Sequence, residues 1–460
     1  MRGQSNTDEY DALTKRRHEL EEDISYLREG LAGPEKPLIK SPPRSTSDLP
    51  TEGLQPLQQL IPRGAALVEF VLYEPFNPEK NRLAKSRWGS PRYMAFVLKR
   101  EGDAIAVDVG EARSIETSVF DLLAGLRARG TDVTSPAKEL DDRLVAPLRP
   151  HLANTDHVII SPDGVLNLLP FGVLQNRKGQ YLIEQKKITY LTSGRDLLRL
   201  ATSSPSRQSP VIVADPDFGP DEGTAIGSSQ GVSVDGLPEV LSFTRLPGTR
   251  EEAQSLKTIL RLSDEQVLTE GRATEAALKQ LKGPRILHLA THGFSDIVWS
   301  TAGRSRPISQ NRPSESTLQQ SLLRSGLALA GANQRRSGDD DGILTALEVA
   351  GLDLAGTELA VLSACETGVG QVQNGEGIYG LRRALMLAGV RMQIGSLWKV
   401  DDSATRDLMV DFYGRLLAGT SRSQALRQAQ LAMLRDPRHA HPFYWAAFIA
   451  IGDDQPMSGW

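Results

Sequence analysis

Residues 357–370 read TELAVLSACETGVG, and residues 285–294 read RILHLATHGF. Each is a short apolar run that stops at a turn of small residues, as a buried parallel strand does before its loop. One run leads to Cys365 and the other to His292. Because the carboxyl ends of neighbouring strands open onto one crevice in an α/β sheet, we expect the thiol and the imidazole to meet there. A cysteine nucleophile and its base require this arrangement.

Small residues surround both side chains. Gly293 directly follows the imidazole, so its backbone N–H can approach a substrate carbonyl without obstruction by a side chain. We therefore predict His292 and Cys365 as the catalytic residues and the N–H groups of Gly293 and Cys365 as the donors that hold the oxyanion. An inert buried cysteine and a turn histidine remain the alternative. His288, earlier on the same run, is expected in the core.

The composition is that of a soluble globular protein, with 39% hydrophobic and 24% charged residues among 460. A net charge of −4 gives no electrostatic case for nucleic acid. No apolar run reaches the roughly 18 residues of a membrane span, and the N-terminal residues are too charged for a signal peptide. We expect a cytoplasmic protein without membrane contact. The single cysteine fits a reducing compartment and cannot support a thiolate zinc site, so we predict no metal and no cofactor.

Three regions are predicted along the chain. Residues 1–60 read as an amphipathic helix, over residues 7–32, and a Pro/Ser-rich linker. Residues 61–205 are rich in short strands, whereas residues 206–460 alternate strands with helices, which predicts a parallel sheet with right-handed crossovers. Residues 297–341 read as a long polar loop between the two catalytic strands, and we expect it to border the cleft.

Five motifs occur in the order typical of one family: HLATHGF, LSACETG, GEGIYGLRRALMLAGV, GSLWKVDDSAT and HPFYWAAFIAIG. From about Gly64 to Gly452 the sequence resembles the CHAT family, caspase-like proteins of the clan that also holds separase, gingipain and clostripain. The resemblance implies an α/β, caspase-like three-layer fold with a mostly parallel central sheet. It also implies that residues 61–205 form a partial caspase-like half without a catalytic pair. The caspase signature itself is not matched, because Ser363 stands where caspases have glutamine.

The resemblance implies a cysteine endopeptidase that cleaves proteins or peptides through a dyad of His292 and Cys365. Clan members in bacteria often serve signalling, defence or cell-death pathways and await a trigger. CHAT domains usually follow tetratricopeptide repeats, so the N-terminal helix is either a docking helix for an activating or inhibiting partner or a helix packed on its own domain. A non-proteolytic CHAT scaffold, acting as an interaction module, is the alternative function.

The specificity pocket is predicted from GSLWKVDDSAT, residues 395–405. The stretch should follow a strand beside the cysteine strand, which places Asp401 and Asp402 next to the substrate. It is similar to a separase motif in which an aspartate binds an arginine side chain, and the matching position is Asp402. A basic P1 residue, arginine before lysine, is therefore expected. Asp402 or Ser403 also suits the N-cap of the following helix, and both interpretations stay open.

Overall fold

The computed structural model describes residues 54–77, 88–202, 204–220, 242–295, 325–363, 365–366 and 376–457. Most of them belong to one compact unit, Ser45–Glu74 with Ser90–Trp460. The other unit comprises Met1–Arg44 and Pro75–Gly89, and in it the rings of Phe76 and Trp88 pack 5.0 Å apart. The helix predicted over residues 7–32 lies outside the described residues, as do residues 296–324 of the predicted loop.

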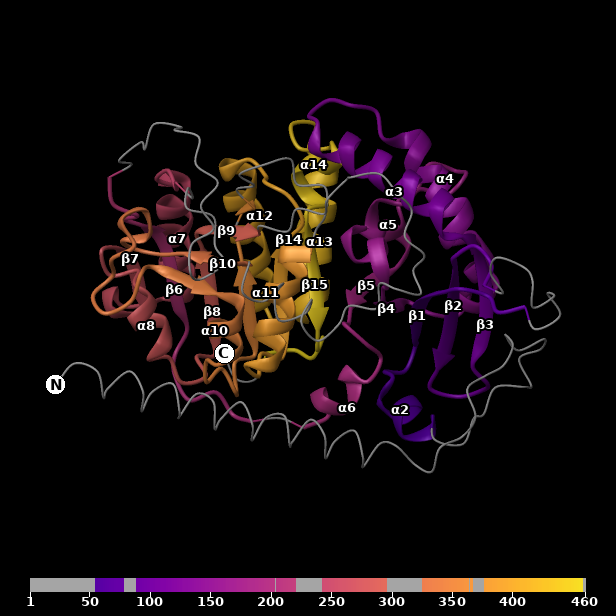
Figure 1. Cartoon of the computed structure of the whole chain (residues 1–460), viewed down its shortest axis with the longest axis horizontal. Coiled ribbons are helices and arrows are strands. Elements are labelled where there is room, and N and C mark those ends of the chain that lie inside the picture. Colours follow the sequence, from indigo (N-terminus) through magenta and orange to yellow (C-terminus); the bar gives the residue numbers. More distant parts are fainter. Residues whose placement is uncertain are drawn as a thin grey trace. The chain divides into compact units, whose positions relative to one another are not determined.

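An 11-stranded sheet runs through the compact unit in the order β3-β2-β1-β4-β5-β15-β14-β12-β8-β6-β7 (Figure 1). Its strands are β1 (Ala65–Tyr73), β2 (Arg92–Lys99), β3 (Ile105–Glu111), β4 (His157–Ser161), β5 (Lys187–Tyr190), β6 (Val211–Pro216), β7 (Val267–Glu270), β8 (Ile286–Ala290), β12 (Leu359–Leu362), β14 (Met392–Ser396) and β15 (Phe448–Gly452). β1, β4 and β5 pair in parallel, and so do β7, β6, β8, β12 and β14. The predicted α/β class with a mostly parallel sheet is confirmed. The sheet continues across residue 205, and the division into domains there stays a prediction.

Helices cover both faces of the sheet. Successive side chains of each strand point to opposite sides, so an apolar strand presents an apolar surface to both helix layers. In β8, Ile286 and Ala290 belong to one apolar core, and Leu287 and Leu289 belong to another. The first core is completed by α3 (Ala112–Arg127), α4 (Thr134–Leu144), α7 (Pro247–Leu260), α12 (Asp402–Leu417), α13 (Arg422–Arg435) and α14 (Pro442–Trp445). On the other face lie α8 (Glu275–Lys279), α10 (Ala346–Ala350) and α11 (Glu376–Leu387), with α2 (Gln55–Leu60) and α6 (Asp196–Leu200) over the N-terminal strands. Burial on both faces explains the nearly continuous apolar runs in the sequence.

A second, 4-stranded sheet in the order β11-β10-β9-β13 adjoins the ends of β8 and β12. Its strands are β9 (His292–Ser295), β10 (Ser325–Ala328), β11 (Ile343–Thr345) and β13 (Cys365–Glu366). The expectation of an unstructured loop up to residue 341 was therefore wrong for β10, which is buried between β9 and β11. Packing decides this strand, because a Cβ on Gly326 would lie 2.6 Å from the Leu344 carbonyl oxygen.

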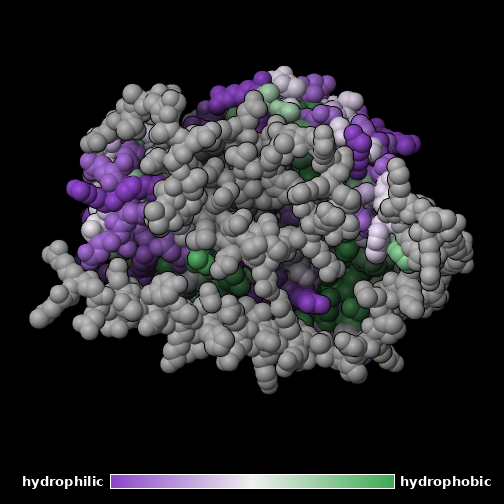
Figure 2. Space-filling model, viewed as in Figure 1, coloured by the Kyte–Doolittle hydropathy of each residue, from purple (hydrophilic) through white to green (hydrophobic). Residues whose placement is uncertain are grey.

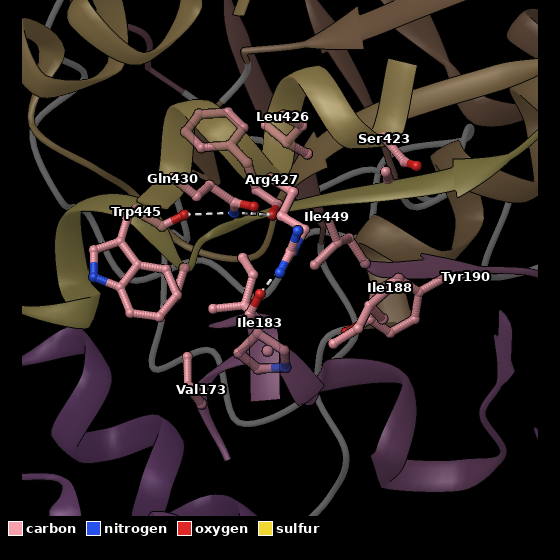
Figure 3. A pocket seen from close by; sticks show the side chains of 15 residues that line it. Val173, Ile183, Ile188, Tyr190, Ser423, Leu426, Arg427, Gln430, Trp445 and Ile449 are labelled. Carbon is pink, nitrogen blue, oxygen red and sulfur yellow. Dashed lines mark hydrogen bonds between the residues drawn. The ribbon is translucent and has the colours of Figure 1, made fainter. Parts of the chain in front are cut away.

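The two parts of the large sheet join at β5 and β15 through one residue pair, Tyr190 with Ile451. A small, mostly apolar crevice with a volume of about 30 Å³, partly open to solvent, lies against this junction (Figure 3). Across the crevice, the Arg427 guanidinium on α13 donates hydrogen bonds to the carbonyl oxygens of Ile183 and Glu184, at 2.7 and 2.9 Å. Ile183 and Glu184 belong to the short helix α5 (Leu182–Gln185) that precedes β5. Arg427 therefore ties the N-terminal strands to the C-terminal part of the sheet.

At one end of the sheet, β7 is an edge strand. In the view of Figure 2, hydrophilic residues gather on the side where Figure 1 places β7 and α8. Arg250 and Glu270 form an exposed ion pair there, and both also neighbour Arg245. Charged side chains along an edge strand discourage pairing with other chains.

Replacing Arg427 tests its role at the junction. Arg427→Ala should lower the free energy of unfolding by about 1.5–3 kcal/mol, since two backbone carbonyls lose a charged hydrogen-bond donor. Urea unfolding of the full chain measures this loss. Arg438→Ala is the matched control, because Arg438 is exposed and bonds only locally, to Asp436, among the described residues. An Arg427→Ala loss no larger than that of Arg438→Ala would contradict the role.

Candidate active site

The backbone register brings the two predicted catalytic residues together. β8 and β12 pair in parallel with Leu289 opposite Leu362. Three residues further along each chain, β9 and β13 pair in parallel with His292 opposite Cys365. The offset between the two chains is unchanged from one ladder to the next. The central sheet therefore sets the placement of His292 and Cys365 as direct neighbours on adjacent strands.

The imidazole of His292 is held in a defined orientation. Its Nε2 lies 2.8 Å from the carbonyl oxygen of Thr244, and because a carbonyl only accepts hydrogen bonds, Nε2 carries the proton. Nδ1 is then the unprotonated nitrogen, and no described residue donates to it. The rings of Phe218 and Phe243 pack on the imidazole with centroids 5.3 and 5.7 Å away. The free nitrogen is the one available to accept a proton.

Burial sets the protonation state of this imidazole. His292 is only 1% exposed, and the loss of hydration lowers its pKa below the usual 6.5. The hydrogen bond to Thr244 and the Asp402 carboxylate act in the opposite direction, and the Lys399 ammonium lowers the pKa further. At neutral pH the ring is therefore uncharged, which is the form that a general base needs.

The predicted oxyanion donor Gly293 lies within the small sheet. It stands opposite Leu327 of β10 and Glu366 of β13. Next to it, the Thr291 hydroxyl donates a hydrogen bond of 2.6 Å to the Ala328 carbonyl oxygen, which fixes the turn between β8 and β9. The oxyanion role of Gly293 and Cys365 stays a prediction.

The two predicted specificity aspartates have different environments. Asp401 is the N-cap of α12, accepting hydrogen bonds from the backbone N–H groups of Ser403 and Ala404, and its carboxylate also pairs with Arg129 at 3.0 Å. The expectation that Asp402 or Ser403 supplies the cap was therefore wrong. Asp402 is exposed and packs over Gly248, where a Cβ would approach the Asp402 Cβ to 2.5 Å. Of the two, Asp402 keeps its carboxylate free of the cap.

His288 is a core residue, as expected. It is fully buried, with Nδ1 3.1 Å from the Tyr413 hydroxyl and Nε2 3.2 Å from a carboxylate oxygen of Glu252, away from hydrogen-bond geometry. The other oxygen of Glu252 accepts from the Ser363 hydroxyl at 3.2 Å. A buried hydrogen bond between Ser363 and Glu252 thus holds the chain directly after β12.

Sequence reasoning missed the residues that surround His292. Phe218 and Phe243 lie in sequence without periodicity, and the Thr244 contact is made by a backbone carbonyl, which every residue type possesses. The only signal was the position of Phe218, two residues after the buried end of β6.

Comparison with known proteins identifies the family. The profile of the CHAT domain matches residues 134–453, more than half of the chain. The chain belongs to the CHAT domain family. The resemblance seen in the sequence motifs is thus confirmed, although the match begins at residue 134 and not near Gly64.

Curated relatives of this CHAT domain chain are tetratricopeptide repeat protein 28 of Homo sapiens and of Mus musculus. The human protein is 26% identical over 358 residues, which cover 72% of this chain and 14% of that protein. The mouse protein is 25% identical over 355 residues, covering 70% of this chain and 13% of that protein. The chain thus spans about one seventh of the length of these relatives.

Among solved structures, the chain is similar to Saccharomyces cerevisiae separase in its complex with securin, at 10% identity and a TM-score of 0.40, covering 87% of this chain and 30% of that one. It is also similar to the Arg-specific cysteine proteinase gingipain R, at 10% identity and a TM-score of 0.37, covering 75% and 76% of the two chains. In the part of the CHAT chain that the structure describes, no helix is long and apolar enough to cross a membrane. The same residues contain no cluster of three His, Cys, Asp or Glu side chains suited to a metal ion.

The state of the imidazole can be measured directly. In histidine-labelled protein, NMR titration of His292 should give a pKa below 6.5, because burial disfavours the charged ring. The same shift means that protonation favours unfolding, so this site's contribution to stability is complete above pH 6.5 and is lost as the pH falls through the lowered pKa. The His292→Gln variant assigns the resonance. A His292 pKa at or above 6.5 would contradict the assigned burial.

Proposed function

We propose that this CHAT domain chain is a cysteine endopeptidase with Cys365 as nucleophile and His292 as base. The observation that supports the proposal best is the ladder that pairs the two residues across neighbouring strands. Residues paired in this way lie about 4.8 Å apart and project to the same face of a sheet. The hydrogen bond from Nε2 to Thr244 adds support, since it leaves Nδ1 as the proton acceptor.

In the proposed reaction, the Cys365 sulfur bonds to the substrate carbonyl carbon while its proton passes to Nδ1 of His292. The carbonyl oxygen becomes an oxyanion and accepts hydrogen bonds from the N–H groups of Gly293 and Cys365. When the C–N bond breaks, Nδ1 gives its proton to the leaving amine, and a thioester remains. Water then attacks the thioester, a proton passes through Nδ1 to the leaving sulfur, and the acid product departs. Throughout the cycle, Nε2–H remains hydrogen-bonded to the Thr244 carbonyl oxygen.

The position of Asp402 supports the proposal of a basic P1 residue. Its carboxylate acts on the electrostatics of His292 and is not used by the helix cap. A carboxylate can accept two parallel hydrogen bonds from a guanidinium, and an apolar P1 side chain would leave the charge unpaired. In this proposal Asp402 recognises arginine before lysine, whereas Asp401 shapes the pocket by capping α12.

The proposed substrate is a protein or peptide. Activation by a partner or trigger is part of the proposal because the base, His292, is buried. His292 is 1% exposed and packs against Phe218 and Phe243, so in this proposal activation uncovers the imidazole for substrate. A signalling, defence or cell-death pathway, and a partner that acts through the N-terminal helix, belong to the same proposal.

A non-proteolytic scaffold is the second candidate function. The burial of the His292 imidazole favours this function. So does the comparison with the curated relatives, which are named for their tetratricopeptide repeats and of whose length this chain spans only a small share. In this reading the CHAT domain contributes a docking surface to a larger protein, and the paired Cys365 and His292 have no catalytic part.

An acyloxymethyl-ketone peptide probe separates the two functions. We expect one probe molecule per chain on Cys365, and no labelling or peptide cleavage in Cys365→Ala or His292→Ala. Cys365→Ala should keep the wild-type melting temperature within a few degrees, whereas His292→Ala, which removes a buried ring from between Phe218 and Phe243, should lower it. Cleavage that survives in Cys365→Ala would rule out the thiol mechanism, and an unlabelled wild type with and without candidate activators would favour the scaffold.

Paired aspartate variants test the specificity pocket. Asp402→Asn should reduce kcat/KM for arginyl substrates. The reduction should correspond to an increase of about 1.5–3 kcal/mol in activation free energy, the range for a hydrogen bond to a charged group. Asp401→Asn is the matched control: it should cost stability of about 1 kcal/mol or less through the weaker cap and leave the ratio of arginyl to leucyl turnover unchanged. A P1-scanned peptide set provides both measurements. Equal P1 profiles for wild type and Asp402→Asn would place the pocket elsewhere.

A further inference from the structure

The base His292 is enclosed by two chain segments that come from different places in the sequence. Phe218 follows β6, and Phe243 and Thr244 precede α7. Both phenyl rings contact the imidazole, and together with Phe294 they form a small apolar core. The orientation of His292 therefore depends on how these two segments are held against each other.

One side chain bonds to both segments. Asn333 lies in the short helical turn Ala332–Gln334 that follows β10. Its Oδ1 accepts a hydrogen bond of 2.8 Å from the Phe243 N–H, and its Nδ2 donates to the carbonyl oxygens of Phe243, at 3.0 Å, and Gly219, at 3.1 Å. The amide thus pairs with Phe243 as a neighbouring strand would, and it reaches the residue after Phe218.

Backbone contacts make the same connection firmer. The N–H groups of Gly331 and Asn333 donate to the carbonyl oxygens of Asp217 and Phe218, both at 2.9 Å. On the far side of Thr244, Arg245 forms a two-point ion pair with the buried carboxylate of Asp215, at 3.1 and 2.8 Å. The Thr244 carbonyl that accepts the hydrogen bond from Nε2–H therefore lies between two fixed residues, Phe243 and Arg245.

We propose that Asn333 is a positioning residue for the His292 imidazole, acting through Phe243 and Thr244. Without the amide, Phe243 loses both of its hydrogen bonds to Asn333, Gly219 loses the third, and the Thr244 carbonyl is no longer held at Nε2. Either ring nitrogen can then carry the proton, and the tautomer with a proton on Nδ1 cannot accept one from a thiol. The inference rests on the proposed function for its catalytic meaning, but the tautomer itself does not.

The test is the tautomer of His292, measured without substrate. The full chain is labelled with ¹³C,¹⁵N-histidine, and the resonances of His292, one of 7 histidines, are assigned by their loss in His292→Gln. Wild type should show the Nε2–H form alone, and Asn333→Ala should show a mixture of the two tautomers at the same pH. If the peptidase assay succeeds, kcat/KM of Asn333→Ala should fall on the order of 100-fold, the loss expected for a catalytic group displaced by about 1 Å.

The matched control is Asn176→Ala. Asn176 also makes three side-chain hydrogen bonds in a turn, to Lys178 and Gln180, but this turn lies between β4 and β5, away from His292 in the sequence. It should leave the His292 tautomer unchanged. If Asn333→Ala does not fold, the near-isosteric Asn333→Asp replaces it, since it keeps the acceptor for the Phe243 N–H and loses both donors. A folded Asn333 variant in which His292 stays entirely in the Nε2–H form would overturn this proposal and leave the peptidase proposal standing. If the tautomer shifts as predicted but the wild type cleaves no peptide, the role of Asn333 stands and the peptidase proposal fails.

Discussion

The pairing of β8 with β12 is the constraint on which the rest of the site depends. Both strands are buried on two faces, so their backbone groups must be satisfied by each other and by β6 and β14. A slip by one residue would exchange Leu287 and Leu289 with Ile286 and His288 between the two helix layers. The apolar core therefore fixes the register, and the register alone brings His292 and Cys365 into adjacent positions. Contacts at the site itself are not needed for this proximity.

This division of labour explains what the sequence could reveal. β8 and β12, the strands that lead to His292 and Cys365, were predictable because burial on two faces imposes long apolar runs. The parallel sheet followed from the alternation of such runs with helices. β10 was not predictable, since SGLA has no β-branched residue, and its strand conformation is imposed by β9 and β11 on either side. The surroundings of His292 were hidden for another reason: they join three segments distant in sequence, and one essential contact comes from a main-chain carbonyl.

Adjacent aspartates at the start of α12 show how finely backbone geometry separates two equal side chains. The N-cap position has extended backbone angles, φ −64° and ψ 131° at Asp401, and from there a short side chain reaches the N–H groups two and three residues on. Asp402 is the first residue of α12, so its side chain is not in the position from which a cap reaches these N–H groups. Sequence spacing leaves a choice of neighbouring cap positions, and the turn of the chain before the helix decides between them. Trp398, buried and bonded through its indole N–H to the Phe443 carbonyl, fixes that turn.

The order of strands in the large sheet has a consequence for folding. β15 follows the other strands of this sheet in the sequence, yet it lies between β5 and β14 in the middle of the sheet (Figure 1). β1, β4 and β5 can pair with one another, as can β6, β8, β12 and β14, but each group keeps one open strand edge until residues 448–452 are in place. Open strand edges of this kind invite association with other chains. A folding intermediate without β15 therefore exposes two edges to aggregation, and the insertion of this one strand covers both.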